Sequence, residues 1–568
     1  MSELNVEVIQ SRRGTPTARV SLSGRPIMIH SLYDPLAEAR KQVESCKIVP
    51  GCRVVVCGAG LGYVLEALDQ QCSEAGTVSV LVLEPIPELY EQLKPYVNQR
   101  EFLHSRPVTR VGGSDDLIDS ARSFLNGTSP SMIRVLTNPG YQRLDPRRMD
   151  KMVSAVYKLM LYEGMNLMTG FLQGMRGFMN VARNIGQVAG KPGIKELFGL
   201  FKGVPAAVVS AGPSLDRSVD YLKELSGRML IVAVDGALKP LLGHGIKPHL
   251  VVAADENPGN VRKFSGQGQI DGTALAVVPS VDPGVFTGFT GPVFMSHVPL
   301  PAVMWLEWMG IRSGTLEGWG SVASLAFDLT VKLGADPIVF FGQDCSYPRW
   351  KIYARGQGVE EAWSNELDRF KTLEKKNLDT VLKSGFKWDT DINGYSVPSA
   401  VKMAAYRDYL VTMIEQSGRT VMNASGEGIL SGRGVTSVNA ASLGTRFPRL
   451  TSDPAEMIEQ LYRESKVSRR KKLVMGLNKC ARAIDTIINE IRTEVPDSGV
   501  SLREAVTHPV VEFMLGAAVR LFLDGPLASG TATEQHLSML RQGLEDGRRV
   551  VDDALAALEG GCPCIHRT

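Results

Sequence analysis

The sequence predicts an α/β protein with two parallel sheets and an α-helical C-terminal region. Short apolar segments typical of buried strands alternate with helical patterns, first over residues 53–84 and again from Val204 to Asp344. Glycines gather where these apolar segments end, and from Pro454 onward apolar residues recur at helical spacing. At roughly 150 residues per domain, 568 residues predict three or four domains.

Composition limits the classes of function. Hydrophobic residues make up 44% and charged residues 22%, which excludes a disordered or collagen-like chain. The 63 basic and 60 acidic residues nearly cancel, so bulk charge predicts neither a nucleic-acid partner nor an anionic membrane surface. No long apolar run predicts a membrane span, and the polar stretch 1–14 has no export signal pattern. The 8 cysteines are too sparse for a disulfide framework, and Cys562 and Cys564 lack a second pair at zinc-ligand spacing. We therefore expect a cytoplasmic protein with reduced thiols.

Residues 1–150 contain the first strand, turn and helix unit. The run RVVVCGAGLGY places Gly58, Gly60 and Gly62 after an apolar strand, and the next strand ends at Glu84. In Rossmann-like domains such glycines admit a phosphate to a helix N-terminus, while the acid binds ribose hydroxyls. A nucleotide, S-adenosylmethionine for methyl transfer, or no ligand at all would each fit this pattern, and we favour an empty Rossmann-like domain. The Met-rich residues 151–200 predict a helical connector.

Residues 201–445 form the second α/β series and carry the sharpest motif. Gly212 permits close backbone approach, Pro213 suits a helix start, and Ser214 offers a hydroxyl beside free helix N–H groups. This combination predicts an anion pocket suited to a phosphate, with a plain strand-to-helix turn as the alternative. Asp235 and Asp255 end the next strands, so the carboxyl edge of the sheet is expected to hold a shared site.

Further polar residues follow later strands and turns of this series. Gln343 and Asn423 could read a base or a sugar, and Asp344 could act as a base or a ligand. The aromatic stretch from Ser346 to Ala400 suits a lid or an acceptor-binding insertion. Within it, Asn393 and Gly394 predict a hairpin with a type I′ turn. A calcium loop starting at Asp389 fails because Ala400 stands where that loop needs glutamate.

Several of these motifs, taken in order, resemble a known family. GPSL at 212–215, VDGALKPLLGHGIKPH at 234–249 with Asp255 after it, GSVASLAFDL at 320–329, FGQDCSY at 341–347 and NASGEG at 423–428 look like the central domain of the motility-associated factor (Maf) flagellin glycosyltransferases. The N-terminal GAGLGY unit also resembles that family. The resemblance implies a sialyltransferase-like central domain, similar as well to the archaeal-type pterin pyrophosphokinase domain.

The same resemblance implies a cytoplasmic enzyme that moves a nonulosonic acid, of pseudaminic or legionaminic type, from its CMP donor to Ser or Thr of flagellin. No nucleic acid or membrane partner is implied, and a divalent metal is left open. The family often has histidine where this chain has Tyr353, so the general base falls to Asp344 or Asp255. The predicted catalytic residues are Asp344, Asp255, Tyr347 and Tyr353, and the predicted donor-binding residues are Ser210, Gly212, Pro213, Ser214, Asp235, Gly320, Ser321, Gln343, Asn423 and Glu427.

Two other functions stay open. A Mg/ATP-dependent pterin pyrophosphokinase-like enzyme would use Asp235 and Asp255 as magnesium ligands. A non-catalytic flagellin-binding scaffold would suit the missing histidine and the helical C-terminal region. The expected domains are an N-terminal Rossmann-like domain at 1–150, a helical connector at 151–200, a central nucleotide-sugar-binding domain at 201–445 and an α-helical domain at 446–568.

Overall fold

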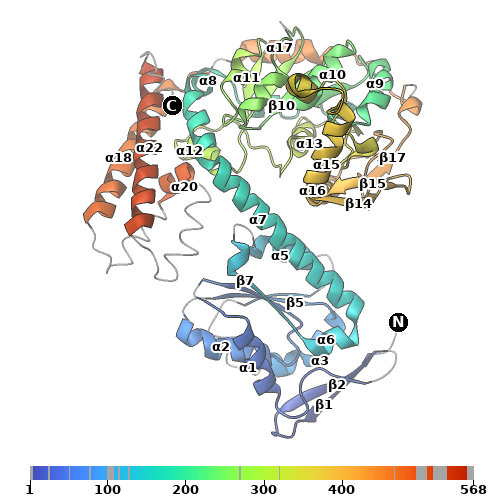
Figure 1. Cartoon of the computed structure of the whole chain (residues 1–568), viewed down its shortest axis with the longest axis vertical. Helices are drawn as coiled ribbons and strands as arrows, with labels where there is room; N and C mark the ends of the chain where they lie inside the picture. The colour runs from blue at the N-terminus through green and yellow to red at the C-terminus, as the bar shows by residue number, and fades with distance from the viewer. Residues whose placement is uncertain are drawn as a thin grey trace. The chain divides into compact units, whose positions relative to one another are not determined.

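The computed structural model divides the chain into two compact units (Figure 1). Among the residues that the structure describes, the first unit contains those up to 172, and the second contains 173–493, 508–515 and 541–559. The structure describes residues 4–22, 26–49, 51–75, 78–98, 108–112, 116–125, 128–267, 270–318, 320–444, 446–465, 467–493, 508–515 and 534–559.

The first unit is built around a four-stranded parallel sheet in the order β6-β5-β4-β7. An antiparallel sheet, β1-β2-β3, precedes it and was not predicted from the sequence. The elements are β1 Leu4–Gln10, β2 Pro16–Leu22, β3 Ile27–Met28, α1 Pro35–Ser45, β4 Arg53–Cys57, α2 Tyr63–Ala75, β5 Ser79–Glu84, α3 Pro87–Asn98, β6 Val108–Gly112, α5 Asp116–Leu125, β7 Ile133–Thr137, α6 Pro139–Leu144 and α7 Pro146–Arg183.

The second unit contains an eight-stranded parallel sheet in the order β12-β11-β10-β9-β8-β13-β16-β17. Its elements as far as β13 are α8 Ile185–Gly190, η2 Ile194–Leu197, β8 Ala206–Val209, α9 Leu215–Glu224, β9 Leu230–Val234, η3 Asp235–Ala237, α10 Leu238–Gly243, β10 Leu250–Ala253, η4 Pro258–Lys263, β11 Ala274–Val277, α11 Gly284–Thr287, β12 Val293–Met295, α12 Pro301–Trp308, α13 Val322–Lys332 and β13 Ile338–Phe341. After β13 come η5 Pro348–Trp350, α14 Val359–Trp363, η6 Ser364–Glu366, α15 Leu373–Lys383, β14 Phe386–Thr390, β15 Ser396–Ala400, α16 Val401–Ser417, β16 Val421–Asn423, β17 Val435–Ser437 and α17 Pro454–Glu464.

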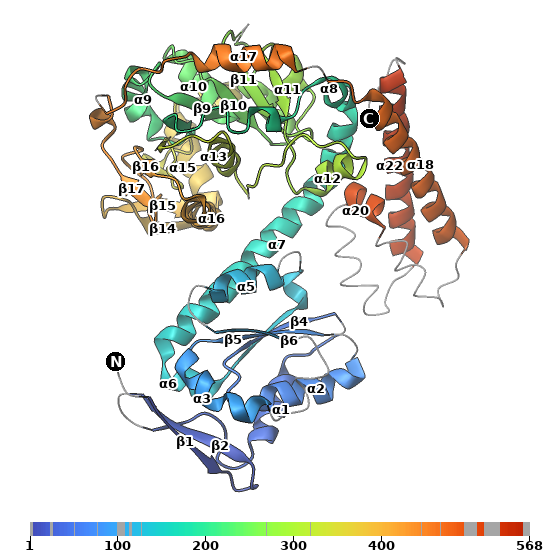
Figure 2. The ribbon, with the colours of Figure 1, turned by 180° about the vertical axis from the view of Figure 1, so that it is seen from behind.

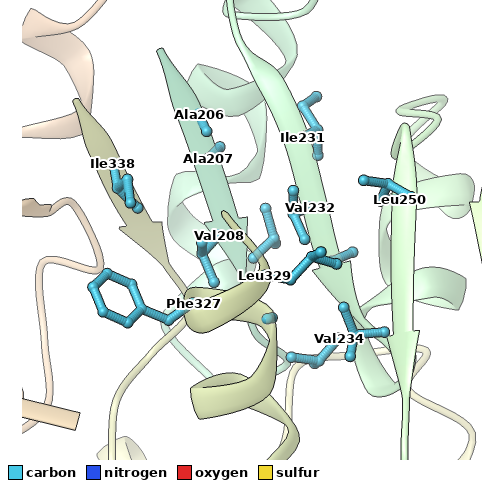
Figure 3. Packing of buried hydrophobic residues seen from close by; sticks show 14 of the residues in the cluster. Ala206, Ala207, Val208, Ile231, Val232, Val234, Leu250, Phe327, Leu329 and Ile338 are labelled. Carbon is cyan, nitrogen blue, oxygen red and sulfur yellow. The ribbon is translucent and has the colours of Figure 1, made fainter. Parts of the chain in front are cut away.

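The core of the second unit lies between this sheet and its helices. The central strands are buried on both faces, which is why they read as continuous apolar runs. α13 packs across β8, β9 and β10, and Phe327 and Leu329 bring its apolar face to the strands (Figure 3). Figures 1 and 2 show α9 and α10 on the other side of the sheet from α13. The rigid sheet thus fixes the positions of the loops that follow its strands.

Two helices outside residues 201–445 also join this unit. Asn180 in the last turn of α7 and Asn184 just after it donate hydrogen bonds from their side-chain amides to backbone carbonyls of residues 256 and 279–281. α17 lies against β11 and η2, and its Ile458 belongs to the core of the sheet. These contacts bind α7 and α17 to the carboxyl-end loops and to the edge of the sheet.

The remaining helices are α18 Arg470–Thr493, α20 Pro509–Leu515 and α22 Glu534–Glu559. α20 packs on α12 and α18, with Phe513 edge-on to Trp308. Two parallel sheets followed by helices confirm the predicted α/β class with two Rossmann-like domains and an α-helical C-terminal region. Cys562 and Cys564 lie outside the described residues. Among the residues that are described, no helix has both the length and the apolar character needed to cross a membrane.

Candidate functional site

The strand order of the larger sheet marks a place for a ligand. From β8 the chain continues outward through β9, β10, β11 and β12, and it then returns to place β13 on the other side of β8. Open parallel sheets bind ligands at the carboxyl ends of the strands beside such a reversal. The loops that leave β8, β9, β10, β13 and β16 carry most of the residues predicted from the sequence.

Residues from the ends of β8 and β13 meet at the reversal; we call Ser210, Ser214, Gln343 and Asp344 the switch-point cluster. The hydroxyl of Ser210 donates to Oε1 of Gln343 at 2.5 Å. The backbone N–H of Ser214 donates to Oδ2 of Asp344 at 2.9 Å, and its hydroxyl donates to Oδ1. The structure therefore brings these predicted residues together as two hydrogen-bonded pairs, Ser210 with Gln343 and Ser214 with Asp344.

Asp344 occupies the position at which the sequence predicted a phosphate. Its side chain is buried, and burial raises the pKa of this carboxyl to about 7 although both hydrogen bonds from Ser214 lower it. The Ser214 amide and hydroxyl at the start of α9 are thus used by an internal acid. The turn at Gly212 and Pro213 holds a carboxylate of the chain itself, so an incoming anion needs other donors.

Glycines allow the two loops to come this close. A Cβ on Gly212 would lie 2.4 Å from the carbonyl oxygen of Gly342, and one on Gly428 would lie 2.4 Å from the carbonyl oxygen of Asp344. Gly342 also has a φ of 65°, a left-handed conformation that side chains disfavour. Any larger residue would push the loops of β8, β13 and β16 apart.

A second group comes from the segments that follow β9, β10 and β13, and we call Asp235, Asp255, Lys263 and Tyr353 the edge cluster. The ammonium of Lys263 lies 3.0 Å from Oδ2 of Asp235, whose side chain is only 5% exposed. Oδ1 of Asp255 accepts the backbone N–H of Asn257 at 3.0 Å. The pKa of the Tyr353 phenol is raised, first by loss of water around it and then by the charges of Asp235 and Asp255, while Lys263 lowers it. The Lys263–Asp235 ion pair joins the loops after β9 and β10, and the charges of Lys263, Asp235 and Asp255 all act on the Tyr353 phenol.

Tyr406 and Gln357 adjoin the edge cluster but were not identified from the sequence. Burial raises the pKa of Tyr406, and so do Tyr347, Tyr353 and Asp255. Lys263 was also missed. Each of these residues reaches the region from a segment without a recognisable motif, so only the folded chain could reveal them.

The predicted turn residues Gly320 and Ser321 support this region from the start of α13. A Cβ on Gly320 would lie 2.4 Å from the ring of Tyr406. Separately, the side chain of Gln357 lies beside Gly236, the residue that follows Asp235. Ser321 caps α13 by accepting the backbone N–H of Ser324 at 3.3 Å. Gly320 therefore leaves room for a tyrosine, and Ser321 starts the helix.

Glu427 joins two arginines above the start of α9. Nη1 of Arg349 lies 3.0 Å from Oε1 of Glu427, and Arg217 binds the same oxygen. Nη2 of Arg349 also donates to the carbonyl oxygen of Pro213 at 2.9 Å. Arg349 has a φ of 55°, so its backbone is held in a strained conformation of the kind found at binding sites.

Two other predicted residues make hydrogen bonds or packing contacts within the chain. Asn423 is buried, with its amide nitrogen donating to the carbonyl of Leu430 and its oxygen accepting the N–H of Ser425. Tyr347 is buried against Val381 and Ala400, and burial raises the pKa of its phenol. Asn423 therefore shapes the loop after β16, and Tyr347 packs under the insertion.

The insertion contains the expected hairpin with a different turn. β14 and β15 pair antiparallel, which confirms the hairpin. The type I′ prediction was wrong, because the connection spans residues 391–395 and among its residues only Gly394 has a positive φ. Asp391 closes the loop by accepting the backbone N–H groups of Asn393 and Tyr395. The prediction considered only Asn393 and Gly394, whereas the side chain of Asp391 determines this turn.

In the first unit, side chains of the chain fill the glycine-rich turn. Nε2 of His30 accepts the N–H of Leu61 at 2.9 Å, and a Cβ on Gly60 would lie 2.3 Å from that nitrogen. Glu84 accepts the N–H of Ala59 and the hydroxyl of Tyr141. The amides and the acid that would hold a nucleotide are thus engaged within the unit.

Comparison with known proteins places the fold. No curated protein matches the sequence. Residues 179–349 match the model of the 6-hydroxymethylpterin diphosphokinase MptE-like family. A solved Maf glycosyltransferase from Magnetospirillum magneticum AMB-1 is similar over 98% of this chain and 92% of its own, with a TM-score of 0.54 and 16% identity. The chain therefore has the fold of a Maf glycosyltransferase, and the resemblance seen in the sequence is confirmed at the level of the fold.

Proposed function

We propose that this protein is an O-glycosyltransferase that transfers a nonulosonic acid from its CMP donor to Ser or Thr of flagellin. The observation that carries the proposal is the edge cluster, in which two acids, a cation and a tyrosine gather at the carboxyl ends of β9 and β10, next to the reversal between β8 and β13. The likeness in fold to a glycosyltransferase over nearly the whole chain supports it. The donor and the acceptor come from the family resemblance in the sequence motifs.

Asp255 is the proposed general base. Asp344, the other sequence candidate, is buried with both oxygens bound to Ser214, so an acceptor hydroxyl cannot reach it without breaking that arrangement. Asp255 is only half-buried, and its Oδ2 accepts no hydrogen bond from the described residues. We assign Asp344 a positioning role, in which it holds the turn after β8 against the loop after β13.

The proposed reaction is a displacement at the anomeric carbon. The acceptor oxygen forms a bond to that carbon, its proton passes to Asp255, and the bond to the CMP phosphate breaks with its electron pair leaving on the phosphate. Charge develops on the departing phosphate, so hydrogen-bond donors and positive charge near it lower the barrier. The phenols of Tyr353 and Tyr406 are the proposed donors because the charge of Asp255 acts on both and helps to raise the pKa of each.

Mass spectrometry of flagellin tests this function. Incubation of the purified protein with a CMP-nonulosonic acid and flagellin is expected to add the mass of the sugar. Asp255→Asn is expected to slow transfer by about 10²–10⁴-fold, the usual contribution of a general base. Asp282→Asn is the matched control, because Asp282 accepts the N–H of Gly284 in the neighbouring loop. No added mass, with a known transferase active in the same assay, would refute the proposal.

The match to the MptE-like model keeps a Mg/ATP-dependent diphosphokinase as the second candidate. That reaction would need Asp235 and Asp255 as magnesium ligands, whereas Asp235 is engaged by Lys263. Thermal unfolding separates the two functions, since a bound ligand raises the melting temperature. CMP is expected to raise it, and a rise with ATP and Mg²⁺ alone would favour the diphosphokinase. A scaffold without catalysis is contradicted if Asp255→Asn abolishes modification while the protein stays folded.

A further inference from the structure

Lys263 places a positive charge at the carboxyl end of β9. It is the last residue of η4, and its ammonium reaches across to the end of β9, 3.0 Å from Oδ2 of Asp235. Its side chain is 18% exposed and the aspartate side chain 5% exposed, so the pair is shielded from water on most sides. Such a pair persists only where its geometry is well supported.

The backbone that carries Lys263 is anchored on both sides. The next residue, Phe264, is buried and packs edge-on against Phe289 with the ring centroids 6.4 Å apart. A Cβ on Gly284 would lie 2.8 Å from Val261, so η4 and α11 are in direct contact. The ammonium therefore extends from a fixed point and is not a freely moving surface charge.

The acids do not fit a magnesium ion in this arrangement. Mg²⁺ requires nearly octahedral oxygen ligands at about 2.0–2.1 Å. Oδ1 of Asp235 already accepts the N–H of Gly236 at 2.6 Å, and Oδ2 faces the ammonium of Lys263. Oδ1 of Asp255 is held by the N–H of Asn257. A metal ion at Asp235 would have to displace a cation that the chain itself supplies.

We infer that Lys263 is the resident cation of the edge cluster and binds the phosphate of the donor in place of a divalent metal ion. This inference rests on the proposed function and specifies how the site meets an anionic donor. An ammonium has three N–H donors, of which Asp235 uses one, so others can reach a phosphate oxygen. The neighbouring phenol of Tyr353 can donate to the same group.

A metal titration tests the inference without an activity assay. Mn²⁺ serves as the probe, and the signal of free Mn²⁺ in electron paramagnetic resonance gives the amount bound, with and without CMP. The wild type and Asp235→Asn are expected to give the same curve, since Asp235 is not a metal ligand. One equivalent of Mn²⁺ bound by the wild type and lost in Asp235→Asn would overturn the inference.

Calorimetric titration with CMP tests the role of the ammonium. The wild type is expected to bind CMP equally in Mg²⁺ and in EDTA, and Lys263→Met is expected to bind it about tenfold or more weakly in both. The double variant Lys263→Met/Asp235→Asn leaves no unpaired buried carboxylate and is expected to show the same loss. Lys332→Met is the control, because Lys332 forms a comparable pair with Asp328 at 2.7 Å.

The outcomes separate the two claims. If folded Lys263→Met binds CMP as tightly as the wild type, the inference about Lys263 is wrong while the proposed function stands. If the wild type binds no CMP in either buffer, the proposed function fails, and the Mn²⁺ titration still decides whether Asp235 takes a metal ion.

Discussion

Replacing Asp344 by asparagine should remove a large pH dependence from the stability of the second unit. Burial raises the pKa of Asp344 from 3.8 to about 7. Between these values the folded chain keeps a proton that the unfolded chain has released, so stability falls as pH rises through this window. A shift of about three pKa units corresponds to a loss of about 4 kcal/mol, complete above about pH 7.

Asparagine preserves the arrangement while removing the charge. Its oxygen can accept the N–H of Ser214, and its amide can donate to the Ser214 hydroxyl. Asp344→Asn should therefore match the wild type near about pH 4 and gain on it by about 1.4 kcal/mol per pH unit up to about pH 7.

Tryptophan fluorescence in urea can measure this difference in one unit alone, because all 6 tryptophans lie between residues 305 and 388. Asp379→Asn is the matched control: it removes a carboxylate that is 41% exposed and paired with Lys375. Exposed pairs of this kind contribute about 1 kcal/mol or less. A stability difference between wild type and Asp344→Asn that stays constant with pH, or shrinks as pH rises, would refute the buried-acid explanation.

Three further predictions follow from contacts and charge. Gly60→Ala should destabilise the first unit by about 2 kcal/mol or more, because its Cβ would clash with His30 and because the backbone there has a φ of 57°. Faster hydrogen exchange in residues 53–70 would show this loss, and unchanged exchange would contradict it. Gly212→Ala should lower the free energy of unfolding by about 1–3 kcal/mol, because the new methyl group would clash with the carbonyl oxygen of Gly342. The urea midpoint of tryptophan fluorescence measures this loss, and an unchanged midpoint would contradict it. Burial lowers the pKa of His249 from 6.5 to about 4, so the free energy of unfolding should fall by about 3 kcal/mol as pH drops through this window. His249→Asn keeps an acceptor for the N–H of Ile231 and should lack that loss in acid titrations. Equal acid sensitivity of the variant and the wild type would count against this explanation.

The fold was predictable wherever a local pattern determines a local structure. Apolar runs ending in polar residues located β8, β9, β10 and β13, because strands buried on both faces must be apolar throughout. The same rule located the switch-point cluster, since the carboxyl ends of neighbouring parallel strands share one edge. The antiparallel sheet β1-β2-β3 was missed because its half-exposed strands give only a weak pattern.

The chemistry of the site depended on contacts that no local pattern encodes. The motif around Ser214 looks like an anion pocket, yet whether the anion is a ligand or Asp344, 130 residues away, depends on how β8 and β13 pair. Lys263 and Tyr406 come from η4 and α16, segments without a motif, and they reach the edge cluster through packing. Sequence reasoning thus predicted that these residues follow neighbouring strands of the sheet, and it did not identify Lys263.

The filled glycine turn of the first unit has a practical consequence for counting ligands. With His30 and Tyr141 lodged against Gly60 and Gly58, a nucleotide would have to expel two side chains before it could touch the backbone there. A saturating titration with CMP should accordingly reach no more than one equivalent per chain. A photoreactive nucleotide should label peptides of the second unit alone, so the measured stoichiometry can be assigned to a single site without deleting either Rossmann-like domain.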